Sequence, residues 1–279
     1  MTPIKAGYLS HHLEALDKMA IWKELSSATK SRIADIEIHS KLDSTNSRLM
    51  ALASCNSVPS GTVCLAEYQT QGRGRIGRVW HTPPGGNICL SLLWRFKNFD
   101  SFSGLSLAVG VSIAKALRTA GIEGVGLKWP NDILWRERKL GGILVEASGE
   151  AQGSHAVVIG IGINVHIPSN RTGDIDQAWV DLDQITTGHP PSRNQLIALL
   201  LDELFLLLQD YPVRGLQSHI EEWRQWHCQV GQKAVLHLGG KAIRGVVSGV
   251  SDDGLLVMDC DDGGLRQFAS GDLKLRPDD

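Results

Sequence analysis

Features that mark several protein classes are missing from this chain of 279 residues. Its five cysteines are scattered and form no C-x-x-C pair, which argues against a disulfide scaffold or a zinc ribbon and fits a reducing compartment. The longest apolar stretch, residues 197–208, is too short for a membrane span and contains Asp202 and Glu203. No apolar segment of signal-peptide length lies near the N-terminus. These absences predict a cytoplasmic protein with no membrane partner.

The chain also has no excess of basic residues. Its net charge is -2 and its pI is near 6.5, whereas proteins that mainly bind duplex DNA are usually basic. We therefore expect no DNA partner. Hydrophobic residues make up 42% of the chain and charged residues 21%, which is ordinary for a folded protein with one large domain and a small one.

Apolar spacing predicts both helices and strands. We expect helices at residues 11–25, about 46–54, 104–120, 193–210 and 213–226. We expect a strand that begins at 36–39 and further strands at 61–69, 87–95, 125–129, 139–147 and 155–165. The pattern changes after His227, where residues 233–276 alternate apolar and polar between tight glycine turns. This predicts five short strands in a small barrel, with a domain boundary near 228–231.

The segment Gly72–Arg78 contains three glycines and three arginines. Glycine lets a backbone bend or approach a ligand closely, and guanidinium groups bind phosphate or carboxylate oxygens in pairs. The segment predicts a loop that closes over a polyphosphate, with a solvated connector or a weak RNA-binding patch as the alternative. It also fits G-x-G-x-x-G, but that fingerprint opens a helix. Here Pro83, Pro84 and a β-type run at 87–94 follow, which excludes it.

Three further motifs lie at predicted strand ends. Lys128–Asp132 (KWPND) supplies a cation, an amide and a carboxylate, or is an ordinary turn. Lys139–Ile143 (KLGGI) places a lysine beside glycines at the mouth of a strand, where it meets an anion or simply reaches water. Gly160–Asn164 (GIGIN) leaves room for a flat group against the backbone, with Asn164 at a purine edge, or is a close-packed strand crossing.

Together with Asp43–Asn46 (DSTN) and Gln69, these motifs follow an order that resembles the bacterial biotin protein ligases, the biotin–acetyl-CoA-carboxylase ligases. The resemblance runs from about residue 36 to the C-terminus. It implies an α+β fold with a class II aminoacyl-tRNA-synthetase-like catalytic domain at 36–228, built on a mixed sheet with flanking helices. An SH3-like β-barrel would follow at 229–279, and a short helical extension at 1–35 would precede both.

The resemblance also implies a two-step reaction. Such ligases join biotin to ATP, giving biotinyl-5′-AMP and pyrophosphate, and then pass biotin to one lysine of the biotin carboxyl carrier protein of acetyl-CoA carboxylase. Mg²⁺ is expected, held mainly through the phosphates, and no metal ligands are assigned.

The resemblance assigns roles to individual residues. The implied catalytic residues are Lys139, Arg73, Arg75 and Asp132, with Asp132 accepting a proton from the attacking amine. The implied biotin-binding residues are Ser44, Thr45, Asn46, Gln69, Arg73, Gly74, Arg75 and Lys139. The implied ATP- or adenylate-binding residues are Arg78, Trp80, Lys128, Asn131, Asn164 and Arg276.

Several alternatives stay open. Only about 35 residues precede Ile36, whereas a winged helix-turn-helix takes roughly 60. We therefore expect a ligase that lacks a complete module of that kind, and the alternative is a ligase-repressor whose N-terminus is missing from this chain. A lipoate ligase is the nearest enzymatic alternative, and a DNA-binding regulator with biotinyl-adenylate as corepressor is a non-enzymatic one. A homodimer through a sheet edge is compatible with the sequence.

Overall fold

A computed structural model describes residues 14–54, 58–96, 102, 104–148, 155–168 and 177–275. Its larger part is built on a seven-stranded sheet of order β1-β2-β3-β7-β6-β5-β4. The strands are β1 (Asp35–His39), β2 (Thr62–Ala66), β3 (Asn87–Phe96), β4 (Val125–Lys128), β5 (Asp132–Trp135), β6 (Arg138–Ser148) and β7 (His155–Asn164). β1 and β2 are parallel and the other pairs are antiparallel, so the mixed sheet expected from the resemblance is confirmed.

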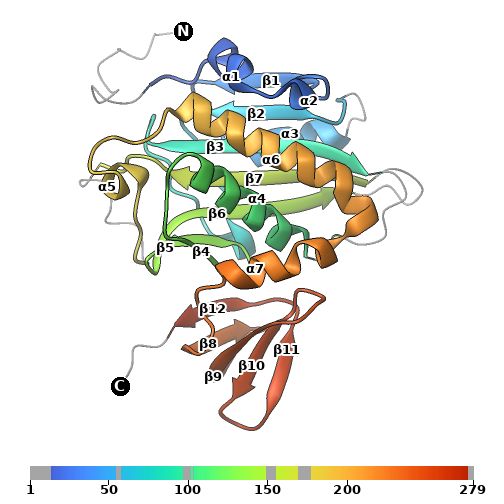
Figure 1. The fold of residues 1–279 in the computed structure, drawn as a ribbon, viewed down its shortest axis with the longest axis vertical. Helices are drawn as coiled ribbons and strands as arrows, with labels where there is room; N and C mark the ends of the chain where they lie inside the picture. Colours follow the sequence, from blue (N-terminus) through green and yellow to red (C-terminus); the bar gives the residue numbers. More distant parts are fainter. Residues whose placement is uncertain are drawn as a thin grey trace.

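Helices cover the two faces of this sheet unequally. α4 (Leu105–Thr119), α6 (Arg193–Arg214) and α7 (Ile220–Trp226) lie over one face, and α3 (Thr45–Ser54) lies behind the other (Figure 1). Side chains alternate accordingly along each strand. In β2, Val63 and Leu65 join the large core on the α4 side, whereas Cys64 joins a small cluster with Leu49 of α3. The sparse α3 side leaves space for a cavity.

The smaller part is a five-stranded antiparallel sheet of order β11-β10-β9-β8-β12. Its strands are β8 (Lys233–Leu238), β9 (Lys241–Val250), β10 (Leu256–Cys260), β11 (Leu265–Phe268) and β12 (Asp272–Leu275). The expected five strands are confirmed, and Gly239 and Gly240 turn the first hairpin with φ of 56° and 77°. This barrel contacts the larger part directly, because Trp129 Nε1 donates to Gly254 O at 3.1 Å. Just before the barrel, His227 forms an isolated β-bridge with Leu127 at the end of β4.

The N-terminal segment differs from the single helix expected at 11–25. Residues 11–13 lie outside the described residues, and the first described helix, α1 (Lys18–Glu24), begins only where the Asp17 carboxylate accepts from Ala20 N. Ser26 then caps a separate short helix, α2 (Ser27–Lys30). Side chains that bond backbone N–H groups start helices, and two such caps divide this segment.

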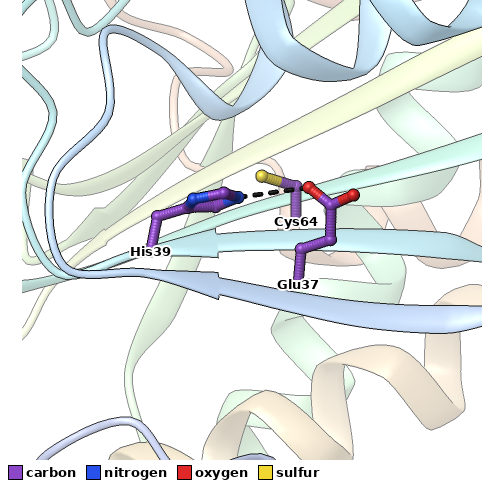
Figure 2. A group of neighbouring side chains, drawn as sticks. All are labelled: Glu37, His39 and Cys64. Atoms are coloured by element: carbon purple, nitrogen blue, oxygen red, sulfur yellow. Dashed lines mark hydrogen bonds and ion pairs between the residues drawn. The ribbon is translucent and has the colours of Figure 1, made fainter.

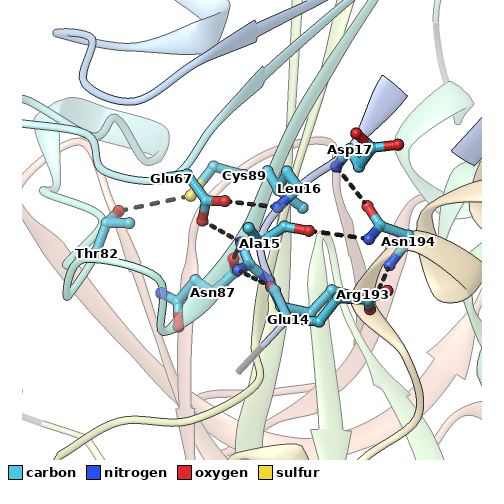
Figure 3. A network of polar contacts seen from close by, with 10 residues as sticks. All are labelled: Glu14, Ala15, Leu16, Asp17, Glu67, Thr82, Asn87, Cys89, Arg193 and Asn194. Carbon is cyan, nitrogen blue, oxygen red and sulfur yellow. Dashed lines mark hydrogen bonds and ion pairs between the residues drawn. The ribbon is translucent and has the colours of Figure 1, made fainter. Parts of the chain in front are cut away.

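Buried polar contacts tie residues 14–17 to the start of α6 (Figure 3). The Arg193 side chain is 1% exposed and donates to Glu67 Oε2 at 2.7 Å, to Asn87 O at 3.1 Å and to Glu14 O at 3.0 Å. Glu67 in turn accepts from Leu16 N at 2.7 Å. The segment ahead of the sheet is thus held by the same ion pair that holds α6.

Other boundaries differ from the sequence-based prediction in detail. β5 and the short α5 (Leu182–Ile185) were not predicted, and two 3-10 turns, η1 (Arg75–Gly77) and η3 (Leu216–Ser218), interrupt loops. α6 runs through Pro212 to Arg214, and the break falls at Gly215, whose φ is 58°. No helix among the described residues is long and apolar enough to cross a membrane.

Candidate active site

A cavity of about 270 Å³ lies on the α3 side of the sheet, where β6 begins and β7 ends. The Gly72–Trp80 segment, hereafter the arginine loop, covers it, and Gly271, Asp272 and Leu273 of the barrel form one wall. Most of the side chains predicted from the sequence line this one space. They are Ser44, Thr45, Asn46, Gln69, Arg73, Gly74, Arg75, Arg78, Trp80, Lys128, Asn131, Asp132 and Lys139. Their individual roles stay predictions.

Hydroxyl and amide groups form one end of the cavity. Backbone bonds between 42–43 and 69–71 hold the start of α3 beside Gln69, whose Oε1 accepts from Thr45 N at 2.8 Å and lies 3.1 Å from Thr45 Oγ1. Ser91 Oγ lies 2.8 Å from Thr45 Oγ1 and 2.6 Å from Asn46 Oδ1. We refer to these four residues as the polar end. Buried groups of this kind suit a ligand with both N–H donors and a carbonyl acceptor.

Glycines make the floor of the cavity flat. A Cβ on Gly160 would stand 2.2 Å from Asn46 Oδ1, and one on Gly162 would stand 2.4 Å from the Trp80 ring. The indole of Trp80 therefore lies directly on the strand backbone, with Lys139 Nζ 5.8 Å from its centre. The sequence predicted room for a flat group here, and in this structure the chain's own indole occupies it.

The arginine loop is a tight hairpin closed by Trp80 N donating to Gly72 O at 2.9 Å. Its three guanidinium groups each reach a different wall. Arg73 forms a two-bond pair with Glu146 of β6, at 3.0 and 2.7 Å. Arg75 donates to Asn131 Oδ1 at 3.3 Å, and Arg78 pairs with Asp272 of β12. Burial lowers the pKa of Arg75, with the nearby Asp132 and Asp272 carboxylates opposing the shift, and a guanidinium stays charged regardless.

Asp132 lies between two lysines. Its Oδ1 is 2.6 Å from Lys139 Nζ, and its Oδ2 is 3.7 Å from Lys128 Nζ. The hairpin of β4 and β5 explains the arrangement, because Lys128 and Asp132 are paired in register on either side of the turn. Asn131 fixes the turn to β6 by donating to Ile143 O at 2.8 Å. The KWPND and KLGGI motifs thus form one cluster with two positive charges and one negative.

Asn164 is placed differently from the prediction, and Arg276 is not placed. Among the described residues, Asn164 is the predicted side chain that does not line the cavity. Its amide donates to Val180 O at 3.1 Å and to Lys139 O at 3.3 Å, so it supports the strand that carries Lys139. Arg276 lies outside the described residues.

The described residues contain one group with metal-ligating side chains close together, and it lies outside the cavity. Glu37, His39 and Cys64 share a face of β1 and β2 (Figure 2). Glu37 already accepts from Arg48 and His39, and burial raises the pKa of the Cys64 thiol to about 12, which disfavours the thiolate that metals bind. Ion pairing accounts for this group without a metal.

Reasoning from sequence missed several lining or supporting residues. Glu146 and Ser91 both contact Asn46, and Asp272 contacts Arg78. The only signal in the sequence was the alternation of side chains along a strand. Gly142, Leu144 and Glu146 are spaced by two residues and so share one face of β6. No local pattern marks Asp272, because it reaches the cavity from the barrel.

Comparisons with known proteins agree with this geometry. The profile of the Biotin/lipoate A/B protein ligase family matches residues 39–164, and that of the Biotin protein ligase C terminal domain matches residues 233–276. The bifunctional ligase/repressor BirA of Escherichia coli is 36% identical over 84% of this chain and 72% of its own length. The chain belongs to the biotin protein ligase family.

A second relative and a solved structure support the same family. The biotin–[acetyl-CoA-carboxylase] ligase of Mycobacterium tuberculosis is 31% identical over 80% of this chain and 83% of its own length. The structure of Aquifex aeolicus biotin protein ligase in complex with biotin and ATP superposes with a TM-score of 0.74, at 28% identity, over 88% of this chain and 100% of that one. The α+β fold and ligase family expected from the motifs are therefore confirmed.

Proposed function

We propose that this chain is an ATP-dependent biotin protein ligase whose cavity joins biotin and ATP to biotinyl-5′-AMP and pyrophosphate. Biotin then passes to a lysine of the biotin carboxyl carrier protein of acetyl-CoA carboxylase. One observation carries the proposal: five cationic side chains surround a single cavity whose other end is polar. The cations are Arg73, Arg75, Arg78, Lys128 and Lys139.

The polar end suits the ureido head of biotin. That head has two N–H donors and one carbonyl acceptor, and Thr45 and Gln69 present hydroxyl and amide groups to the cavity. Lipoate has no such head, so the polar end favours biotin over lipoate.

The cationic groups suit the first step. A biotin carboxylate that attacks the α-phosphorus of ATP brings two anions together, and fixed positive charge offsets their repulsion. Lys139 and Lys128 both line the cavity beside Asp132, and we place the meeting point of this carboxylate and phosphate there. The electron pair of the breaking P–O bond leaves with pyrophosphate, whose charge Arg75 and Arg78 would stabilise.

The second step needs an acceptor for a proton. A neutral lysine amine of the carrier attacks the acyl carbon of the mixed anhydride, AMP leaves, and the amine must lose a proton. Asp132 is the carboxylate at the cluster where that carbon would lie. We assign it the role of orienting the amine and accepting the proton.

Mg²⁺ would be held mainly by the phosphates of ATP. Both carboxylates that line the cavity are already paired with cations, Asp132 with Lys139 and Asp272 with Arg78. This leaves no free protein carboxylate for the ion among the described lining residues. When bound, the ion would neutralise phosphate charge.

The test is transfer of labelled biotin to a purified carrier domain, with ATP, with and without Mg²⁺, and with lipoate as competitor. We expect metal-dependent labelling that excess lipoate does not reduce. A carrier whose acceptor lysine is replaced by arginine is the matched control and should stay unlabelled. Labelling with lipoate but not with biotin would assign the cavity to the other branch of the family, and no labelling of several active carriers would refute the ligase function.

A further inference from the structure

Glu146 joins two separate parts of the cavity. Its Oε2 accepts from Asn46 Nδ2 at 3.0 Å, and the same atom accepts from Arg73 Nη1 at 3.0 Å. Its Oε1 accepts from Arg73 Nη2 at 2.7 Å. A single carboxylate on β6 therefore links α3, which carries the polar end, to the arginine loop. Two parallel bonds from one guanidinium are the strongest and most directional pairing that a carboxylate makes.

A chain of hydrogen bonds continues from Glu146 into the polar end. Ser91 lies between Asn46 Oδ1 at 2.6 Å and Thr45 Oγ1 at 2.8 Å. The Ser91 and Thr45 hydroxyls have two protons for three contacts, and Gln69 Oε1 already accepts from Thr45 N at 2.8 Å. Asn46 Oδ1 therefore receives its hydrogen bond from Ser91, and the Thr45 hydroxyl is shared between Ser91 and Gln69.

This assignment gives the chain a direction. Ser91 donates to Asn46 Oδ1, and Asn46 Nδ2 donates to Glu146 Oε2, while Thr45 Oγ1 keeps a lone pair for a ligand N–H. A ligand that bonds to Thr45 or Asn46, which both line the cavity, would hold these bonds, and with them Glu146, in one arrangement. The last bond of the chain ends on the carboxylate that holds Arg73.

We propose that Glu146 is a positioning residue that couples occupation of the polar end to the arginine loop. The inference rests on the function proposed above, since it takes the ligand of the polar end to be biotin. With biotin bound, the bond from Asn46 fixes the Glu146 carboxylate where it pairs with Arg73, and this keeps the loop over the cavity. Glu146 itself contacts neither reacting atom, so it acts on binding more than on the chemical step.

The test is Glu146→Gln, which keeps the shape of the side chain and removes its charge. The KM for biotin, measured by pyrophosphate release, should rise about tenfold, which corresponds to ~1.4 kcal/mol, while kcat changes little. Trypsin cleavage within 73–78 at saturating biotin should become faster. Glu146→Asp, which keeps the charge on a shorter side chain, should restore part of the affinity.

Two matched variants separate coupling from general loosening. Glu37→Gln removes an arginine–carboxylate pair that also holds α3, through Arg48, but Glu37 does not line the cavity. Glu222→Gln removes a pair with Lys115 on the far helices. We expect both to keep the wild-type KM for biotin.

Either of two results would overturn the inference. One is an unchanged KM in Glu146→Gln while the wild type releases pyrophosphate normally. The other is an equal rise in Glu37→Gln, which would attribute the effect to α3 alone. A wild-type protein that releases no pyrophosphate with biotin and ATP would instead refute the proposed function, and this inference with it.

Discussion

At the scale of single residues, Asp132 offers the sharpest separation of the two chemical steps. Asp132→Asn keeps an oxygen near Lys139 but cannot accept a proton. We expect transfer from preformed biotinyl-5′-AMP to fall by roughly 10²- to 10⁴-fold, the usual contribution of a general base. Single-turnover transfer to the carrier domain measures it. Asp183→Asn, which removes a carboxylate paired with His166 outside the cavity, is the control. A wild-type transfer rate in Asp132→Asn would remove Asp132 from the mechanism.

Gly162 tests whether the flat floor matters. In Gly162→Ala the new Cβ would lie 2.4 Å from the Trp80 ring, so the indole must move. Overpacking of this kind costs about 1–3 kcal/mol of unfolding free energy, and we expect the KM for ATP to rise as well. Urea unfolding and pyrophosphate release measure the two effects. In the control, Gly110→Ala, the Cβ meets Leu127 at an ordinary 3.4 Å and should not destabilise. An equal loss of unfolding free energy in Gly162→Ala and Gly110→Ala would contradict the prediction.

Residues were predictable where their neighbours in sequence carried the signal. Arg73, Lys139 and Asp132 stand in short motifs that combine charge with glycine or proline, which few structural roles require together. Glu146 was not predictable, because its partners Asn46 and Arg73 lie 100 and 73 positions away along the chain. Asn164 was assigned to a purine edge because of the glycines before it, whereas its amide faces backbone oxygens instead.

At the scale of elements, the start of α6 depends on one buried ion pair (Figure 3). Arg193→Met would remove the arginine donor from Glu67 Oε2 and from the backbone oxygens of Glu14 and Asn87. Breaking a buried pair from one side costs about 3–5 kcal/mol, and we expect the lower end, because the Glu67 side chain is 20% exposed. Urea unfolding measures the loss. Arg214→Met, at the exposed end of the same helix, should change stability by less than about 0.5 kcal/mol. A small loss in Arg193→Met would show that the pair contributes little.

Elements were predictable from apolar spacing but not where they are short. β3, β6, β7, α3 and α4 all begin and end within about two residues of the expected positions. β5 has only four residues between two turns, too few for alternation to appear. The expected helix at 11–25 had continuous apolar spacing. The described helices begin instead where the side chains of Asp17 and Ser26 cap backbone N–H groups. Separate helices were expected at 193–210 and 213–226, whereas α6 continues through Pro212 to Arg214 and ends before Gly215.

At the scale of the whole molecule, His227 makes the joint between the two parts sensitive to acid. Burial lowers the pKa of His227 from 6.5 to about 4, and its ring packs 4.6 Å from that of Trp223. The unfolded chain therefore binds this proton first as the pH falls. Stability is lost between about pH 6.5 and pH 4, and the loss from this group ends below pH 4.

His227→Phe should remove that dependence while keeping the ring contact. We expect the wild type to lose roughly 2 kcal/mol more unfolding free energy than this variant between pH 7 and pH 5. Urea titrations at the two pH values give the difference. His237→Phe replaces an exposed histidine of β8 and should follow the wild type. Parallel losses in the wild type and His227→Phe would assign the acid sensitivity to other groups.

The barrel wall of the cavity has a consequence for how the protein is made. Gly271, Asp272 and Leu273 line the cavity, and β12, which begins at Asp272, pairs only with β8 among the described strands. During synthesis, the arginine loop and the KWPND turn are made long before β12. Until Asp272 and its neighbours have been made, Arg78 lacks this ion-pair partner and the cavity lacks its barrel wall. The cavity is therefore complete only after β12 has been synthesised and has paired with β8.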